Sequence, residues 1–213
     1  MMKKYTIQFV RHGISYANEV HMLAGWTDVP LTDNGRAELK EIRKCYNFLE
    51  TDRYYSSDLQ RCKETAKILF EPEHPVDEYL PSFREICFHQ LDGSVYTPES
   101  MKEYFSEWVH DKQVKDEETL TPLKKRAMKA LMDFLKKMDD EKFESATIVS
   151  HSGFIRGLMC ALLHFPNEKW NELTVPNGRG YVFTIYMDEL GISGVEVDSI
   201  HHKDSRTFSC ALN

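Results

Sequence analysis

Short runs of apolar residues alternate with longer amphipathic stretches along the chain. The runs have the length and composition of β-strands, and they predict strands at residues 5–10, 53–56, 146–149, 181–187 and 195–200. Strands that alternate with helices are typical of α/β proteins, in which helices cover both faces of a central sheet. We therefore expect a three-layer αβα sandwich built on a mostly parallel sheet.

The amphipathic stretches predict the helices of this fold. Apolar residues recur at helical spacing in the segments 33–49, 58–70, 98–109, 122–138 and 153–163. The first four helices are preceded by side chains typical of an N-cap, which are Thr32, Ser57 or Asp58, Thr97 and Thr121. The last two of these are followed by proline, which favours the first position of a helix. Residues 111–118 form the most polar stretch and are expected to be a solvated loop.

The length and composition are typical of one globular domain. Of the 213 residues, 41% are hydrophobic, which is enough for a substantial core. We expect residues 1–213 to form a single domain, with a helical substrate-pocket segment at about residues 88–120. No segment approaches the ~18 apolar residues of a membrane span. Arg11 and His12 interrupt the only apolar run near the N-terminus, so a signal peptide is not indicated and a cytoplasmic location is expected.

The net charge argues against one class of partner. With 27 Lys and Arg residues against 34 Asp and Glu residues, the chain has a net charge of −7, whereas nucleic-acid-binding domains present a basic face. A locally positive pocket for an anionic substrate is compatible with this charge. The five cysteines form no C-x-x-C pair, so we expect reduced thiols. His201-His202 has no partners at metal-ligand spacing, and no metal site is expected.

Residues suited to phosphate chemistry lie at four junctions between predicted elements. Arg11-His12-Gly13 follows the first strand, Arg61 lies in the first turn of a helix, and His151 follows a buried strand. Glu85 lies in the remaining junction, between Arg61 and His151 in the sequence, and the carboxyl ends of parallel strands converge on one crevice. Arginine forks fit phosphate oxygens, and the N-termini of the two following helices would add N–H donors. Because neutral histidine is a nucleophile, the sequence predicts a phosphate site that contains one.

These residues, in this order and at these separations, resemble the histidine phosphatase superfamily, which is also called phosphoglycerate mutase-like. The resemblance runs from residue 5 to about residue 157. It rests on Arg11-His12-Gly13, Asn18, Gly25-Trp26, Pro30-Leu31-Thr32, Ser57-x-x-x-Arg61, Glu85 and Ser150-His151. It implies a phosphoglycerate mutase-like fold.

The resemblance also implies a role for each catalytic residue. His12 attacks the substrate phosphorus and becomes a phosphohistidine, while Arg11, Arg61 and His151 bind the phosphoryl oxygens. Glu85 protonates the departing alkoxide and then activates the water that cleaves the phosphohistidine. His12 has to be neutral to attack, and the neighbouring guanidinium groups favour that form. No metal or other cofactor is implied, because arginines and histidines take the place of cations.

A second group of residues is expected to bind a small phosphorylated substrate. The Gly13 backbone and Asn18 would add donors at the pocket rim, and aromatic residues after Glu85 would line a leaving-group pocket. The expected substrate-binding residues are Gly13, Asn18, Gly25, Phe88, His89, Tyr96 and Ser152. Tyr104 and Trp108 are expected to pack in the core instead.

The segment after Glu85 distinguishes a phosphatase from a cofactor-dependent phosphoglycerate mutase. The mutases carry a lysine downstream of the acid and a paired arginine farther on, which hold the second acid group of a phosphoglycerate. Here those positions are Val95-Tyr96 and Asp111-Lys112-Gln113. Ala24 replaces the mutases' threonine, and Phe88-His89 replaces their tyrosine-glycine. We therefore favour a phosphomonoester hydrolase over a mutase.

Two alternatives stay open at this stage. Gly25-Trp26-Thr27-Asp28 resembles the mutases closely, so a mutase is the first alternative. The second is a catalytically weak relative that only binds a phosphorylated ligand, although a binding module needs no nucleophile. The core site would accept a sugar phosphate, a phosphoglycerate, a nucleotide or an α-ribazole phosphate. The sequence predicts no particular oligomeric state.

Overall fold

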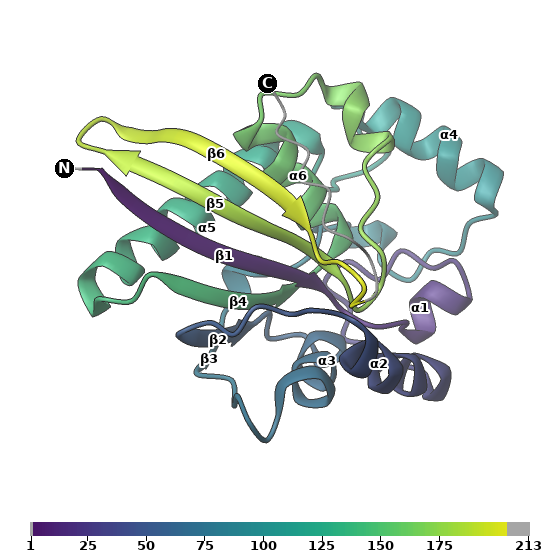
Figure 1. Ribbon diagram of the computed structural model, residues 1–213. Coiled ribbons are helices and arrows are strands. Elements are labelled where there is room, and N and C mark those ends of the chain that lie inside the picture. The colour runs from purple at the N-terminus through teal and green to yellow at the C-terminus, as the bar shows by residue number, and fades with distance from the viewer. Residues whose placement is uncertain (1, 204–213) are drawn as a thin grey trace.

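The computed structural model describes residues 2–203 and is built around one six-stranded sheet (Figure 1). Its strands, in spatial order, are β3 (Glu78–Tyr79), β2 (Arg53–Ser56), β4 (Ser145–Ser150), β1 (Lys3–Arg11), β5 (Gly180–Asp188) and β6 (Gly191–Ser199). The neighbours β3, β2, β4 and β1 pair in parallel. Because β5 and β6 pair antiparallel, the sheet is mixed, and its parallel part carries the predicted site residues.

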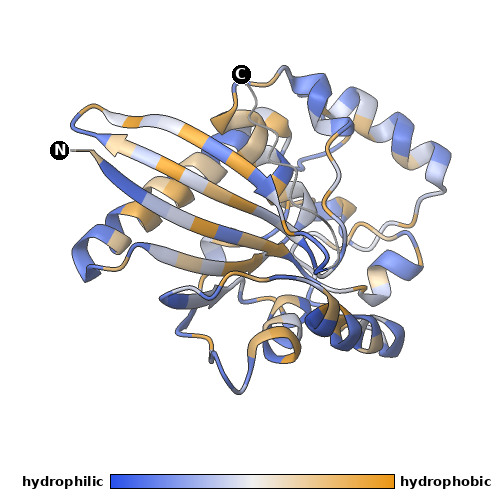
Figure 2. Ribbon diagram, viewed as in Figure 1, coloured by the Kyte–Doolittle hydropathy of each residue, from blue (hydrophilic) through white to orange (hydrophobic). Residues whose placement is uncertain are grey.

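Helices cover both faces of this sheet, which confirms the expected three-layer αβα sandwich (Figure 1). α2 (Asp33–Cys45) and α3 (Gln60–Phe70) pack on the face that buries Val10. α5 (Leu120–Glu141) and α6 (Ser152–Leu162) pack on the opposite face, which buries Phe9. Successive strand residues point to opposite faces, and Figure 2 shows this alternation as apolar and polar bands along the strands.

The register brings the carboxyl ends of three strands to one edge of the sheet. β1 pairs with β4 up to Arg11, and β2 pairs with β4 up to Ser56. The residues that follow these strands, His12, Ser57 and His151, therefore leave the sheet side by side. This arrangement places the chemistry-bearing junctions next to one another, as the sequence predicted.

Helix α4 and several short helical turns lie beyond this edge of the sheet. They are α1 (Tyr16–Glu19), the 3₁₀ turns Pro81–Phe83, His89–Leu91 and Asn167–Asn171, and α4 (Pro98–Trp108). Tyr104 and Trp108 are buried here, as expected, and the Trp108 ring lies 4.8 Å from that of Trp170 between centroids. This cluster supports one wall of the candidate site.

The predicted helices are all present, although several of their ends differ from expectation. α2 ends earlier because the Asn47 N–H leaves the helix and donates to the His201 carbonyl. α3 begins later, since Asp58 pairs with Arg84 instead of capping the helix. α5 begins at Leu120, one residue before the predicted cap Thr121, whose N–H donates to the Asp111 carboxylate instead. These three differences accompany contacts between residues that are ten or more positions apart in the sequence.

The polar stretch 111–118 is folded against α4, so the expectation of a solvated loop was wrong for part of it. Glu117 is 0% exposed and accepts hydrogen bonds from the N–H groups of Val114 and Lys115 and from the Tyr104 hydroxyl. These donors satisfy a buried carboxylate, which would otherwise be costly. The neighbouring Glu118 carboxylate pairs with Arg126.

The cysteines of the described residues are free thiols. Cys62, Cys87 and Cys160 are buried, and Cys45 is half-buried. Cys210 lies outside the described residues. Within residues 2–203, no helix has both the length and the apolar character needed to cross a membrane.

Candidate active site

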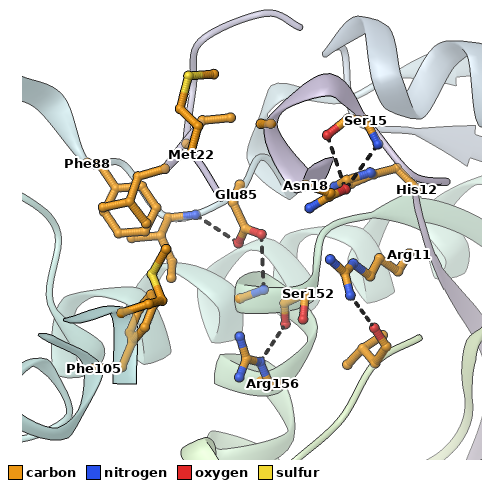
Figure 3. Close-up of a pocket in the computed structure, with 18 of the residues that line it drawn as sticks. Arg11, His12, Ser15, Asn18, Met22, Glu85, Phe88, Phe105, Ser152 and Arg156 are labelled. Atoms are coloured by element: carbon orange, nitrogen blue, oxygen red, sulfur yellow. Dashed lines mark hydrogen bonds between the residues drawn. The ribbon is translucent and has the colours of Figure 1, made fainter. Parts of the chain in front are cut away.

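A cavity of about 550 Å³ opens at the edge of the sheet where β1, β2 and β4 end. Its polar lining consists of Arg11, His12, Ser15, Asn18, Arg61, Glu85, Ser152, Arg156, Asn171 and Thr174. Its main apolar lining consists of Met22, Leu23, Ile86, Phe88, Met101 and Phe105. Figure 3 shows the two groups on different sides, with Glu85 between them. The cavity therefore combines a charged end with an apolar wall.

His12 lies at the charged end and is only 4% exposed. Its Nδ1 is 2.7 Å from the carbonyl oxygen of Gly13. Because a carbonyl oxygen only accepts hydrogen bonds, we assign the proton to Nδ1 and the free lone pair to Nε2. Burial, followed by the charges of Arg61 and Arg11, holds the pKa of His12 well below 6.5. The ring is therefore neutral near pH 7 and has an unprotonated nitrogen, as a nucleophile requires.

Two arginines border this ring and retain donors for an anion. Arg11 donates from Nη1 to the Val175 carbonyl at 2.7 Å. Arg61 donates from Nη2 to the Gly25 carbonyl at 2.7 Å and from Nη1 to the Thr27 carbonyl at 3.0 Å. A guanidinium group has five N–H donors, so both side chains keep some unused. Among the described residues neither forms a salt bridge, and their charge is available to a ligand.

His151 lies behind His12, is fully buried, and does not line the cavity. The two rings meet edge-on, with 5.2 Å between centroids. Nδ1 of His151 accepts from Nε of Arg61 at 3.3 Å, so Nε2 carries the proton and faces the Ser57 hydroxyl at 2.9 Å. Burial, followed by the charge of Arg61, lowers the pKa of His151 well below 6.5. In this arrangement His151 orients Arg61 and presents no free ring nitrogen to the cavity, in place of the expected direct phosphoryl contact.

Glu85 is held by the first turn of α6. Its carboxylate accepts from the N–H groups of Gly153 at 3.1 Å and Phe154 at 3.0 Å, and from the N–H of the following residue at 3.0 Å. At the start of α3, the Gln60 N–H donates in the same way to Asp28 at 2.6 Å. The N–H groups of Gly153, Phe154 and Gln60 are therefore already bound by carboxylates of the chain itself and are not free for phosphate.

The loop at residues 25–27 frames the cavity mouth beside Arg61. The N–H groups of Trp26 and Thr27 both donate to Asp92, each at 3.2 Å, and the Trp26 indole donates to the Glu85 carbonyl at 2.9 Å. Gly25 has a φ of +43°, and a Cβ there would overlap the Asp92 carboxylate. Glycine is therefore required for this loop to approach Arg61 with its carbonyl.

The structure places most of the expected site residues around the cavity. Those that line it are Arg11, His12, Asn18, Gly25, Arg61, Glu85, Phe88 and Ser152. Asn18 is fixed there by the Ser15 N–H and hydroxyl, both 3.1 Å from its Oδ1 (Figure 3). Asn18 and Ser15 therefore form a polar rim on this side of the cavity.

Three expected substrate-binding residues lie elsewhere, which corrects their predicted place. The Gly13 N–H donates to the Thr65 hydroxyl at 2.9 Å, and the glycine packs directly against α2. His89 is exposed to solvent. The Tyr96 ring packs on that of Tyr104, 5.7 Å between centroids. None of the three lines the cavity.

Arg156 lines the cavity and was not identified from the sequence. Its Nε lies 3.4 Å from the Ser152 carbonyl, one turn earlier in α6, and its guanidinium carbon lies 3.5 Å from the centre of the Trp170 ring. The spacing of four residues from Ser152 on a predicted helix would have placed both on one face. That spacing was the signal available in the sequence.

The cavity has a positive formal charge on a negatively charged protein. Among the described residues that line it, Arg11, Arg61 and Arg156 carry three positive charges and Glu85 is the one acidic side chain. With neutral histidines the formal charge is +2, whereas the whole chain carries −7. Such a pocket favours an anion. Within residues 2–203, no three His, Cys, Asp or Glu side chains are grouped so as to hold a metal ion.

The fold and the cavity are typical of α/β proteins that bind a ligand beyond the carboxyl ends of their parallel strands, and the positive charge of this cavity suits an anionic ligand. The family model of the histidine phosphatase superfamily (branch 1) matches residues 7–197. The chain belongs to this superfamily, which confirms the resemblance in its motifs.

Relatives within the family include both mutases and phosphatases. Over 179 residues the chain is 29% identical to a 2,3-bisphosphoglycerate-dependent phosphoglycerate mutase 2 of Gloeobacter violaceus, covering 78% of this chain and 79% of that one. Over 177 residues it is 26% identical to an adenosylcobalamin/alpha-ribazole phosphatase of Salmonella typhi, covering 79% and 85%. The chain is therefore similar to enzymes with different reactions.

Solved structures confirm the fold. A phosphoglycerate mutase from Bacillus anthracis aligns with a TM-score of 0.71 and 21% identity, covering 92% of each chain. A phosphoserine phosphatase from Entamoeba histolytica aligns with a TM-score of 0.70 and 19% identity, covering 94% of this chain and 98% of that one. Since this fold carries both reactions, the choice between them depends on the site.

Proposed function

We propose that the protein is a phosphomonoester hydrolase that acts through a phosphohistidine on a small phosphorylated metabolite, without a metal ion. The observation that carries this proposal is the neutral His12, whose Nε2 is unprotonated inside a cavity of positive charge. A pocket that only binds a phosphorylated ligand has no need of such a nitrogen. The site therefore favours catalysis over ligand binding alone.

In the proposed first step, Nε2 of His12 forms a bond to the substrate phosphorus while the bond from phosphorus to the ester oxygen breaks. Arg11 and Arg61 neutralise the charge that develops on the phosphoryl oxygens. Glu85, which lies between the charged end and the apolar wall, gives a proton to the departing alkoxide. The alcohol leaves, and the phosphoryl group stays on His12.

In the second step, water attacks the phosphohistidine. The Glu85 carboxylate takes a proton from the water as its oxygen bonds to phosphorus, and the bond between phosphorus and Nε2 breaks. Inorganic phosphate leaves, His12 regains its lone pair, and Glu85 is again protonated for the next cycle. The proton stays on Nδ1, hydrogen-bonded to the Gly13 carbonyl oxygen, throughout, which keeps the ring in the same tautomer.

A phosphoglycerate mutase is the second candidate, supported by the similarity to the mutase of Gloeobacter violaceus. The segment that would retain a bisphosphorylated intermediate argues against it. The side chains of residues 111–113 do not line the cavity, because Asp111 accepts from Thr121 and Lys112 pairs with Glu107. Without those cations, we expect the intermediate product to leave and water to complete the reaction.

Two measurements test the proposal. The purified protein should release inorganic phosphate from p-nitrophenyl phosphate in the presence of EDTA. His12→Ala should lose at least about 1,000-fold in activity, because no other group replaces the nucleophile. His110→Ala, which removes an exposed histidine, serves as the matched control. Activity that requires added metal, or an active His12→Ala enzyme, would overturn the proposal.

The phosphohistidine intermediate and the alternative mutase reaction are tested by separate experiments. Rapid acid and alkaline quenching of a reaction with ³²P-labelled substrate should trap an acid-labile, alkali-stable phosphoryl group on the wild type and none on His12→Ala. Conversion of 3-phosphoglycerate to 2-phosphoglycerate that is faster than phosphate release would favour the mutase instead.

A further inference from the structure

Glu85 lies on a piece of chain that is neither helix nor strand. Residues 84–88 have irregular backbone and connect the short turns Pro81–Phe83 and His89–Leu91. Because no helix or sheet hydrogen bonds fix such a segment, contacts from outside it have to hold the main chain of a catalytic residue in place. The first turn of α6 holds the Glu85 carboxylate, and the backbone of Glu85 needs an anchor of its own.

Arg126 of α5 supplies this anchor with its guanidinium group. Its Nη2 donates to the Glu85 carbonyl at 2.9 Å, and its Nη1 donates to the Arg84 carbonyl at 3.0 Å. The Trp26 indole donates to the same Glu85 carbonyl at 2.9 Å, so both lone pairs of this oxygen are used. The guanidinium carbon also lies 5.6 Å from the centre of the Phe154 ring, and the Phe154 N–H binds the Glu85 carboxylate. Arg126 therefore contacts both the main chain of Glu85 and a residue that binds its side chain.

Glu118 holds Arg126 in this position. Its carboxylate accepts hydrogen bonds from Nε and Nη2 of Arg126, each at 2.8 Å, as a bidentate pair. The same carboxylate accepts from the Cys87 N–H at 3.1 Å, and the Glu118 N–H donates to the Cys87 carbonyl at 2.7 Å. Because Glu118 neutralises the guanidinium group, Arg126 holds Glu85 by hydrogen bonds without adding a net cation beside a group that has to carry a proton.

We propose that Arg126 is a positioning residue, which fixes the backbone of Glu85 and thereby places its carboxyl group where it protonates the leaving group. This inference rests on the proposed function and goes beyond it by adding a residue that does not line the cavity. Stability alone does not account for the arrangement. Only 24% of the Arg126 side chain and 11% of the Glu118 side chain are exposed, and apolar residues often replace such a pair without loss of stability.

A matched pair of substrates tests this proposal. Phenyl phosphate and p-nitrophenyl phosphate differ only by the nitro group, and phenolate depends far more on a proton from Glu85 in order to leave. A displacement of about 1 Å costs a reacting group about 100-fold in rate. In Arg126→Gln, kcat/KM for phenyl phosphate should therefore fall at least about 10-fold more than kcat/KM for p-nitrophenyl phosphate.

Two further variants make the comparison specific. Arg126→Lys keeps the charge beside Glu118 without the planar fork, and should show a smaller fall of the same kind. Lys129→Gln removes an exposed cation from the same helix and should keep the wild-type ratio of the two kcat/KM values. Thermal unfolding identifies the folded variants, and Arg126→Lys carries the test if Arg126→Gln does not fold.

The double variant Glu85→Gln/Arg126→Gln shows whether Arg126 acts through Glu85. Once Glu85 cannot donate a proton, the change at Arg126 should cause no further loss that is specific to phenyl phosphate. Equal losses for the two substrates in a folded Arg126 variant, or a further specific loss in the double variant, would overturn the inference, while wild-type hydrolysis still supports the proposed function. No phosphate release from either compound by the wild type would overturn the proposed function itself.

Discussion

Nε of Arg61 donates a hydrogen bond to Nδ1 of His151, 3.3 Å away, directly behind the candidate nucleophile. The other side of the imidazole is fixed by the Ser57 hydroxyl at 2.9 Å. A continuous chain of contacts thus runs from the end of β2 through His151 to the guanidinium group. This chain holds a cation in place before any substrate binds, which is how charge stabilisation is made effective in a transition state.

Removing this support is expected to weaken catalysis through Arg61. His151→Ala leaves Nε of Arg61 without its acceptor, and kcat/KM for p-nitrophenyl phosphate should fall by about 100- to 1,000-fold. His151→Asn places an amide oxygen near the position of Nδ1. Its loss in kcat/KM should be about 10-fold smaller than that of His151→Ala. Steady-state kinetics on folded variants measure the difference. Equal losses in the two variants would show that the imidazole acts on the substrate itself.

The role of Glu85 predicts an effect that depends on the leaving group. Glu85→Gln cannot donate a proton, so kcat/KM for an alkyl phosphate should fall by about 100- to 10,000-fold. p-Nitrophenolate leaves without protonation, and its kcat/KM should change far less. Because the variant also lacks the base for the second step, stopped-flow measurements should show a burst of p-nitrophenol followed by slow turnover. Equal kcat/KM losses for both substrates would contradict the assignment.

The first turn of α6 offers a way to move Glu85 without changing it. A Cβ at Gly153 would overlap Oε1 of Glu85, whereas a Cβ at Gly157 would meet only the flexible end of Leu123, at 2.9 Å from Cδ2. Gly153→Ala should therefore reproduce the leaving-group dependence of Glu85→Gln. Gly157→Ala, in the same helix and with the same gain of about 1 kcal/mol in helix propensity, is the control and should stay active. Similar activities for the two alanine variants would show that the Glu85 carboxylate can be displaced without loss.

The fold and most of the site followed from local patterns in the sequence. The apolar runs predicted β1, β2 and β4, and the residues just after them, including His12 and His151, meet at one edge because parallel strands end together. The prediction missed contacts between distant residues. Glu85 occupies the N-terminus of α6 from 68 positions away, and no local signal shows that those N–H groups are already bound.

Backbone conformation accounts for another part of what was missed. His89 adopts a φ of 48°, in the left-handed region that few non-glycine residues adopt, and its side chain is exposed to solvent. The role of Arg156 in the cavity was missed because the position of its side chain depends on a tertiary contact, the stacking of its guanidinium on the Trp170 ring. Helical spacing gives the face of α6 on which Arg156 lies, whereas the partner of that face is set by tertiary structure.

The two buried histidines make the stability of the protein depend on pH. Burial holds the pKa values of His12 and His151 well below 6.5 in the folded state, whereas both titrate near 6.5 in the unfolded chain. As the pH falls below about 6.5, the unfolded state binds more protons, and the free energy of unfolding should drop by up to about 1.4 kcal/mol per pH unit for each histidine. Urea unfolding between pH 7 and 5 measures this slope. His12→Gln should remove the contribution of one histidine to this dependence of the free energy of unfolding on pH. If the slope of this variant equals that of the wild type, the pKa of His12 is not lowered in the folded protein.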